Sequence, residues 1–380
     1  MRAVFSQVGI ALHRASARWA VLGLVALLAA CASHRPLPLA TAPGLAHVPP
    51  GLAQERLARV SWAQVSGWPA DSLIGVTGAL KQTCSRLGAT DEWRRACSAS
   101  ADLDELDADA TRKFFEEYFT PFQLANANGS VDGLVTGYYE PLLHGSRTRH
   151  PPYLYPLYRM PDRLRGQTSL PDRARLVRSG ELAGYELVYV DDPIEAFFLQ
   201  VQGSGRIVLE DGSVMRVAYG GTNNKPYRSI GRWLIDQGEV SAAQATMQGI
   251  KAWARQNPNR VEALLDVNPR FVFFKEAGGS APIDGHFAED GPIGALGVPL
   301  TPERSIAVDP SAIPLGMPVF LSTTRPSTNV PLERLVFAQD VGSAIRGGVR
   351  ADYFWGLGDA AGDMAGRMKQ SGRMWLLLPN

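Results

Sequence analysis

Three short stretches near the C-terminus decide the fold: SIAVDP (305–310), LVFAQD (335–340) and RADYFWG (350–356). The first two are apolar and bounded by polar or turn-forming residues, which predicts buried strands. The third is a short aromatic segment that fits either a strand or a turn. Each stretch carries an aspartate where a rigid element meets a loop, and binding or catalytic side chains are commonly placed there. The candidates are therefore Asp309, Asp340 and Asp352.

The aromatic residues that follow Asp352 suggest a chemistry for it. Tyr353, Phe354 and Trp355 come directly after this aspartate. Apolar surroundings raise the pKa of a carboxyl group, and a general acid must hold its proton until the substrate needs it. We therefore expect acid–base chemistry on a polar substrate that stacks on aromatic rings, such as a sugar. The alternative for each aspartate is a capping or turn-forming role, which Pro310 favours for Asp309.

The order of the predicted elements excludes a doubly wound parallel sheet. Helical spacing runs through residues 51–124, and short strands rich in β-branched and aromatic residues follow. A helical patch comes next, and strands then return. Because this order does not alternate strand with helix, we predict a mainly β protein with two barrel-like units and peripheral helices. The expected strands are 131–139, 185–190, 196–202, 206–209, 214–219, 271–275, 304–308, 318–322, 335–338 and 373–378, and the expected helices after residue 124 are 229–237, 241–256 and 356–368.

The N-terminus predicts export and a lipid anchor. A basic region around Arg14 and Arg18 precedes the apolar stretch 20–30, which is short for a membrane span. The stretch ends in Leu-Ala-Ala-Cys at residues 28–31, a pattern typical of a bacterial lipoprotein cleavage site. We expect residues 1–30 to be a signal peptide, Cys31 to carry the lipid and residues 31–50 to form a tether. Ala32 favours an outer-membrane lipoprotein that faces the periplasm, and the alternative is an uncleaved signal anchor.

Composition excludes several other classes of function. A net charge of +1 gives no basic excess for nucleic-acid binding. The six histidines form no pair at i, i+4, so no metal is expected, and GLGDAAG (356–362) fails the dinucleotide-loop spacing, so no cofactor is expected. Cys84 and Cys97 remain after Cys31 and predict a disulfide in an oxidising compartment, with two free buried thiols as the alternative.

Several ordered motifs together resemble one family. They are TGYYEP (136–141), VQGSG (201–205), YRSIG (227–231), NPRFVFF (268–274), SIAVDP (305–310), AQDVGSAIRG (338–347) and ADYFWG (351–356). From about residue 110 to the C-terminus the chain is similar to membrane-bound lytic murein transglycosylase A, a family of bacterial enzymes that cut peptidoglycan. The resemblance implies a double-psi β-barrel made from residues 51–135 and 269–380. A second β-rich domain, residues 136–268, would be inserted into it, with a groove for the glycan strand.

The resemblance also implies an active site. In the family one aspartate does the chemistry, and by motif it falls on Asp352, with Asp340 as a second aspartate nearby. The loop between these two residues is one residue longer than the family pattern, which leaves the acid to be decided between them. The substrate-binding residues implied are Thr136, Gly137, Tyr138, Gln202, Gly203, Ser204, Gly205 and Asp309.

The expected reaction cleaves the β-1,4 bond between N-acetylmuramic acid and N-acetylglucosamine without water and leaves 1,6-anhydro ends. The partners expected are glycan strands of peptidoglycan and the membrane, reached through the lipid on Cys31. A cell-wall synthesis complex is a further candidate partner. Two alternatives stay open: an inverting hydrolase that uses Asp340 and Asp352 as a pair, and a noncatalytic peptidoglycan-binding lipoprotein.

Overall fold

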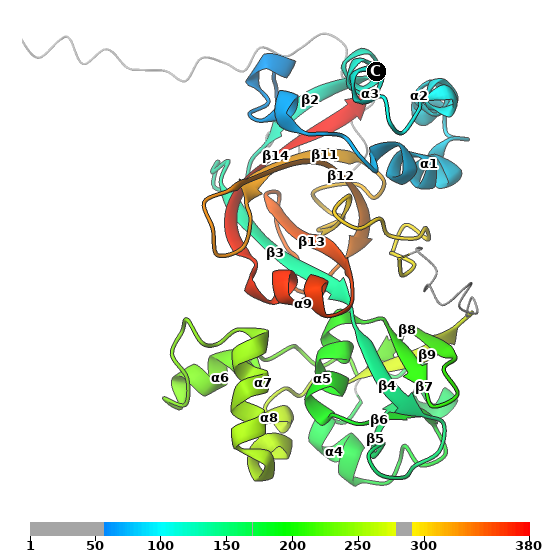
Figure 1. Cartoon of the computed structure of the whole chain (residues 1–380), viewed down its shortest axis with the longest axis vertical. Coiled ribbons are helices and arrows are strands. Elements are labelled where there is room, and N and C mark those ends of the chain that lie inside the picture. The colour runs from blue at the N-terminus through cyan, green and yellow to red at the C-terminus, as the bar shows by residue number, and fades with distance from the viewer. Residues whose placement is uncertain (1–56, 169, 279–290) are drawn as a thin grey trace, which may run out of the picture. The chain divides into compact units, whose positions relative to one another are not determined.

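The computed structural model describes residues 57–168, 170–278 and 291–380, and its larger sheet carries both aspartates of the candidate pair. This sheet has eight strands in the order β1-β2-β14-β11-β12-β10-β13-β3 (Figure 1). Strand β14 also pairs with β3, so six of the strands close into a barrel. The strands are β1 (Leu57–Arg59), β2 (Phe119–Leu124), β3 (Gly133–Glu140), β10 (Ser305–Val308), β11 (Pro318–Thr324), β12 (Pro331–Val341), β13 (Arg350–Leu357) and β14 (Lys369–Pro379).

A second sheet of six strands is built from the middle of the chain. Its order is β5-β6-β4-β7-β8-β9. The chain leaves the barrel after β3 and returns to it at β10, so the second sheet is an insertion between two barrel strands. The mainly β fold with an inserted β-rich part is confirmed. The strands are β4 (Leu142–Ser146), β5 (Tyr155–Tyr158), β6 (Glu186–Val190), β7 (Gly205–Leu209), β8 (Val214–Thr222) and β9 (Val272–Ala277).

The residues at which the chain passes from one sheet to the other differ from the expected domain bounds of 136 and 268. Strand β3 stays paired with β13 as far as Glu140, and Pro141 ends it. Strand β9 pairs with β8 through Ala277, so residues 272–277 belong to the second sheet rather than to the barrel. The expected segments 1–30 and 31–50 lie outside the described residues.

Helices cover the barrel and fill out the insertion. The first three pack with barrel strands in one hydrophobic core, which contains Trp93, Phe115 and Phe337. A separate core joins α5 to α6, α7 and α8. The helices are α1 (Val76–Leu87), α2 (Asp91–Ala99), α3 (Ala108–Tyr118), α4 (Arg173–Arg178), α5 (Pro193–Gln202), α6 (Ile230–Asp236), α7 (Met247–Gln256), α8 (Val261–Asp266) and α9 (Gly358–Arg367).

The strand expected at residues 196–202 is wrong, because this segment is the second half of α5. The carboxylate of Asp192 accepts hydrogen bonds from the backbone N of Ile194 and Glu195, at 2.7 and 3.2 Å. Pro193 occupies the first helical turn, where its missing N–H costs nothing. Gly203, with a φ of +88°, ends the helix in the left-handed region. These start and stop signals outweigh the β propensity of the apolar run between them.

A disulfide between Cys84 and Cys97 joins α1 to α2. The two helices pack beside each other on the barrel core, and Cys84 and Cys97 contact that core themselves. The cross-link therefore ties together a helical pair whose position is also set by packing.

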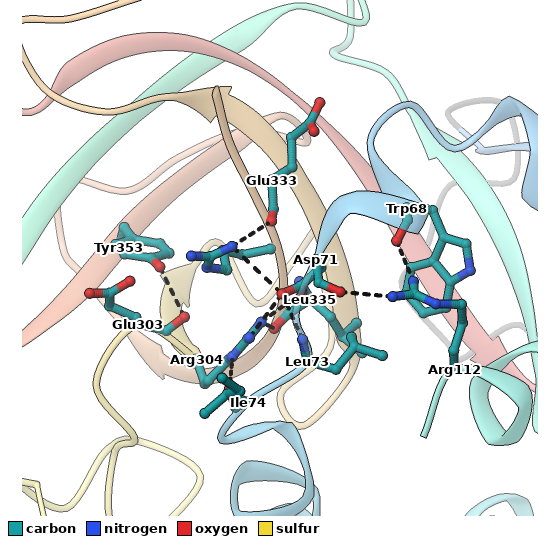
Figure 2. A network of polar contacts seen from close by, with 11 residues as sticks. Trp68, Asp71, Leu73, Ile74, Arg112, Glu303, Arg304, Glu333, Leu335 and Tyr353 are labelled. Atoms are coloured by element: carbon teal, nitrogen blue, oxygen red, sulfur yellow. Dashed lines mark hydrogen bonds and ion pairs between the residues drawn. The ribbon is translucent and has the colours of Figure 1, made fainter. Parts of the chain in front are cut away.

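Asp71 anchors the segment before α1 to the barrel through a buried ion pair (Figure 2). Its carboxylate accepts hydrogen bonds from Nη1 and Nη2 of Arg304, at 2.7 and 2.9 Å. The backbone N of Leu335 on β12 donates a further one at 2.7 Å. Burial raises the pKa of Asp71, but the hydrogen bonds and charge of Arg304 outweigh it and hold the pKa below its usual value.

The substitution Asp71→Asn is expected to lower the free energy of unfolding by about 3–5 kcal/mol, because it leaves the buried Arg304 charge uncompensated. Chemical denaturation at neutral pH measures this. Since folding lowers the pKa of Asp71, its stabilisation is present above the usual value of 3.8 and is lost as the pH falls through the lower folded value.

The matched control is Asp132→Asn. Asp132 forms an exposed ion pair with Arg373 at 2.8 Å, and pairs of this kind contribute about 0–1 kcal/mol. Equal losses in the two variants would contradict the role assigned to Asp71.

Candidate active site

Neighbouring strands of the barrel bring Asp340 and Asp352 into one row. Ala307 on β10 pairs on one side with Asp340 of β12 and on the other with Asp352 of β13. Thr136 of β3 is the next residue across, paired with Asp352. Paired residues on adjacent strands point to the same face, and two strand spacings separate the Cα atoms of the aspartates by about 10 Å. The small, buried side chain of Ala307 lies between them.

Asp352 is half-buried and accepts a short hydrogen bond. The hydroxyl of Thr136 donates to its Oδ1 at 2.6 Å. In turn, Nη2 of Arg350 donates to the Thr136 Oγ1 at 2.9 Å. Burial raises the pKa of Asp352, while the Thr136 hydrogen bond and the charge of Arg350 lower it, and the balance leaves the pKa raised. This side chain is therefore suited to keep a proton that an ordinary aspartate would lose.

Only one of the three aromatic neighbours shares the face of Asp352. Successive residues of a strand point to opposite faces, so Tyr353 and Trp355 point away from it and pack into the barrel core. Phe354, two residues on, lies on the same face and packs against the ring of Tyr138 at 5.2 Å between centroids. Of the three aromatic residues that follow Asp352, Phe354 is therefore the one on the side of the carboxyl group.

Asp340 differs from Asp352 in its hydrogen-bond partners. The hydroxyl of Tyr138 donates to Oδ2 at 3.1 Å, and the backbone N of Ala295 donates to Oδ1 at 3.0 Å. Burial raises the pKa of Asp340 to about 6, in spite of these donors. Burial and both carboxylates also raise the pKa of Tyr138, which keeps its phenol protonated and able to donate.

The two aspartates are therefore prepared for different roles. Both oxygens of Asp340 accept hydrogen bonds, which favours its ionised form. In Asp352, hydrogen bonds among the described residues reach Oδ1 alone. Its Oδ2 is therefore the oxygen that can carry a proton.

Asp309 is placed apart from this pair. Its Oδ1 accepts hydrogen bonds from the backbone N and the hydroxyl of Ser311, and its Oδ2 accepts one from the backbone N of Gly347 at 2.9 Å. Burial raises the pKa of Asp309, but these hydrogen bonds outweigh it and hold the pKa below its usual value. Asp309 thus ties the end of β10 to the loop between β12 and β13, which is the loop that separates Asp340 from Asp352.

The residues of the motif at 136–138 have separate surroundings. Thr136 and Tyr138 each donate to one of the two aspartates. Gly137 lies between them on the other face, where a Cβ atom would come within 2.7 Å of the Trp355 Nε1 and 2.9 Å of the Ala365 Cα. Glycine is therefore required by close packing against β13 and α9, a reason independent of any ligand.

The motif at 202–205 touches the same strand from the insertion. The side-chain Oε1 of Gln202, the last residue of α5, accepts a hydrogen bond from the backbone N of Tyr139 at 3.2 Å. Gly203 ends the helix, Ser204 is half-buried, and a Cβ atom on Gly205 would come within 3.0 Å of the Pro141 carbonyl. The segment therefore lies against β3 just beyond Tyr138.

Two groups in this site were missed by reasoning from sequence. Arg350 stands two residues before Asp352, so strand alternation places it on the same face; assigning residues 350–357 to a strand would have found it. Ala295 contributes a backbone N–H from a loop distant in sequence from Asp340. No side-chain pattern signals such a contact.

Within residues 57–168, 170–278 and 291–380, no group of three or more His, Cys, Asp or Glu side chains is arranged to hold a metal ion. In the same residues no helix is both long and apolar enough to cross a membrane.

Two known protein domains match this chain. The MltA specific insert domain matches residues 134–275, and the 3D domain matches residues 304–378. The chain is 35% identical over 296 residues to membrane-bound lytic murein transglycosylase A of Escherichia coli (strain K12), an alignment that covers 76% of this chain and 74% of that protein.

Solved structures agree with these matches. The lytic transglycosylase LtgG of Burkholderia pseudomallei is 70% identical with a TM-score of 0.65, over 88% of this chain and 98% of that one. E. coli MltA with bound chitohexaose is 31% identical with a TM-score of 0.66, over 81% of this chain and 91% of that one.

Proposed function

The chain belongs to the membrane-bound lytic murein transglycosylase A family, and from this premise we propose that it cleaves peptidoglycan glycan strands with Asp352 as the single acid and base. The bond cut is the β-1,4 bond between N-acetylmuramic acid and N-acetylglucosamine. The E. coli relative solved with chitohexaose, a β-1,4-linked oligosaccharide, supports a glycan as the substrate. The observation that carries the choice of Asp352 is its Oδ2, which accepts no hydrogen bond from the described residues, whereas both oxygens of Asp340 accept one.

The first step is proton transfer to the leaving group. Protonated Asp352 gives its proton to the glycosidic oxygen, and the bond between that oxygen and C1 of the muramic acid breaks with its electron pair going to the oxygen. The sugar ring then carries positive charge, and Asp352 is left as a carboxylate. The raised pKa of Asp352 keeps the proton available above the pH at which an ordinary aspartate loses it.

The second step closes the sugar onto itself. The C6 hydroxyl oxygen of the same muramic acid bonds to C1, and its proton passes to the Asp352 carboxylate. The enzyme regains its starting form, no water is consumed, and a 1,6-anhydro ring is formed. Because the nucleophile is tethered to the substrate, proximity replaces the activated water for which ordinary glycosidases need a second carboxyl group.

Asp340 serves as the anionic partner in this scheme. The hydrogen bonds from Tyr138 and Ala295 favour its ionised form, even though burial raises its pKa to about 6. A carboxylate in the same row as Asp352 stabilises the positive charge that develops on the sugar ring. The half-buried ring of Tyr138, held in place by the buried ring of Phe354, supplies the apolar wall for the sugar.

The masses of the products test the function. Purified protein is incubated with peptidoglycan sacculi, and the soluble fragments are weighed. Fragments lighter by one water and without a reducing end support the proposal. Hydrated fragments with a reducing end would contradict it and favour the inverting hydrolase, in which Asp340 and Asp352 act as a pair.

The substitution Cys31→Ala tests the proposed lipid anchor. We propose that residues 1–30 are removed and that Cys31 holds the protein on the outer membrane, facing the periplasm. The variant is expected to move from the membrane fraction to the soluble periplasmic fraction and to lose incorporation of labelled fatty acid. Cys84→Ser serves as the control, because it should keep both lipid and membrane association. Membrane retention of an unlabelled Cys31→Ala protein would instead indicate an uncleaved signal anchor.

A further inference from the structure

Two consecutive hydrogen bonds connect Arg350 to Asp352 through the hydroxyl of Thr136. We propose that Arg350 is a positioning residue that acts through the Thr136 hydroxyl and thereby assigns the acid proton of Asp352 to Oδ2. This inference rests on the proposed function, in which Asp352 is the acid. It concerns the orientation of that acid, which decides whether its proton faces the substrate.

The backbone register holds Arg350 in place beside Thr136. Arg350 and Asp352 lie two residues apart on β13 and pair with Leu134 and Thr136 on β3, so all four side chains leave the same face. The Arg350 Nη1 donates to the carbonyl oxygens of Leu134 at 3.3 Å and Ala351 at 2.5 Å, while Nη2 donates to the Thr136 Oγ1 at 2.9 Å. Three acceptors therefore fix the planar guanidinium group.

The chemistry of the two side chains decides which atom donates in each of these hydrogen bonds. A guanidinium group has N–H donors and no acceptor, whereas a hydroxyl has one donor and two acceptor lone pairs. The bond from Arg350 uses a lone pair of the Thr136 oxygen and leaves the hydroxyl hydrogen for Asp352 Oδ1, 2.6 Å away. Donation by a cation also polarises the hydroxyl and strengthens its own donation. Because Oδ1 acts as an acceptor, the acid proton resides on Oδ2.

The charges around Asp352 point to the same role for Arg350. Asp352 is the acidic group whose charge acts on Arg350. The titratable groups near Asp352 are Tyr138 on β3, Asp340 on β12 and Arg350 on β13, and the exposed Lys369 on β14 pairs with Thr136. Both the Thr136 hydrogen bond and the Arg350 charge lower the pKa of Asp352 against the effect of burial.

A double-mutant cycle on the full chain tests the proposal. Arg350→Met keeps the length of the side chain without its donors, and Thr136→Val keeps the shape without the hydroxyl. Arg350→Met is expected to lower kcat about tenfold in the wild-type background, the value of a charge-assisted hydrogen bond, and less than about twofold in the Thr136→Val background. The pH profile is the second readout. Either single change removes an influence that lowers the pKa of Asp352, so the alkaline limb should move to higher pH.

Conservative variants keep the test informative where the larger changes affect folding. Thr136→Ser retains the hydroxyl and should keep the wild-type alkaline limb, and Arg350→Lys should lie between wild type and Arg350→Met in kcat. Additive losses in the cycle, or lower kcat with an unmoved alkaline limb, would overturn the proposal and leave a structural role for Arg350. Failure of the proposed function itself is distinguishable, because it would appear as an active Asp352→Asn enzyme.

Discussion

Replacing Asp352 by asparagine is expected to lower the rate of glycan cleavage by about 10⁴-fold, the upper end of the effect of a general acid. The loss is large because one carboxyl group serves twice, first donating a proton to the leaving oxygen and then accepting one from the C6 hydroxyl. Asparagine has the same shape, and Thr136 can still donate to its side-chain oxygen. Folding and glycan binding should therefore be preserved, and release of soluble fragments from sacculi measures the loss.

Asp359→Asn is the matched control for this experiment. Asp359 is an exposed aspartate in the first turn of α9, seven residues after Asp352, and its substitution should leave turnover within about twofold of wild type, as expected for a surface position. Binding of both variants to sacculi is measured by co-sedimentation. Turnover by Asp352→Asn within tenfold of wild type, with an inactive Asp340→Asn, would mean that the acid is Asp340.

The substitution Asp340→Asn is expected to lower kcat about 100-fold by removing the charge that stabilises the transition state. It should also change the pH profile. Asp340 acts as an anion, so wild-type activity is present above its pKa of about 6 and is lost as the pH falls through that value. At higher pH the activity falls again when Asp352 loses its proton. The variant should keep the alkaline limb and lose the acid limb.

The substitution Tyr138→Phe is the comparison for Asp340→Asn, because it keeps the Asp340 carboxyl group and removes one hydrogen bond to it. It keeps the ring beside Phe354 but removes the hydroxyl that donates to Asp340. That hydrogen bond lowers the pKa of Asp340, so its loss should move the acid limb to higher pH rather than abolish it. An acid limb that is unchanged in both variants would show that the limb belongs to another group.

Some strands of this fold could be predicted because the local sequence pattern determines them. The runs that end in Asp309 and Asp340 are apolar and bounded by turn residues, and both are barrel strands. The segment around Asp352 could not be assigned to a strand or a turn from its short aromatic pattern, and pairing with β10 and β3 makes it a strand. The residues at 196–202 show the opposite case, since the cap at Asp192 and the stop at Gly203 outweighed a β-rich composition.

The site itself depends on contacts that local patterns do not carry. The row of Asp340, Ala307, Asp352 and Thr136 is set by the register of four strands, of which β3 is far from the other three in sequence. Thr136 was expected to contact substrate, and in the fold its hydroxyl donates to Asp352. Asp71 gave no signal at all, because an isolated aspartate before a helix reads as a turn residue until Arg304 is brought beside it.

The central claim concerns which of the two aspartates keeps its proton, and carbon-13 NMR of the aspartate carboxyl groups measures this directly. The two signals are assigned by their loss in Asp352→Asn and Asp340→Asn, and both are followed as the pH is raised. We predict that Asp340 ionises first and that Asp352 is still protonated when it does, because hydrogen bonds from the described residues reach both oxygens of Asp340 but only Oδ1 of Asp352. An Asp352 carboxyl that ionises before Asp340, near the usual aspartate value of 3.8, would contradict the account.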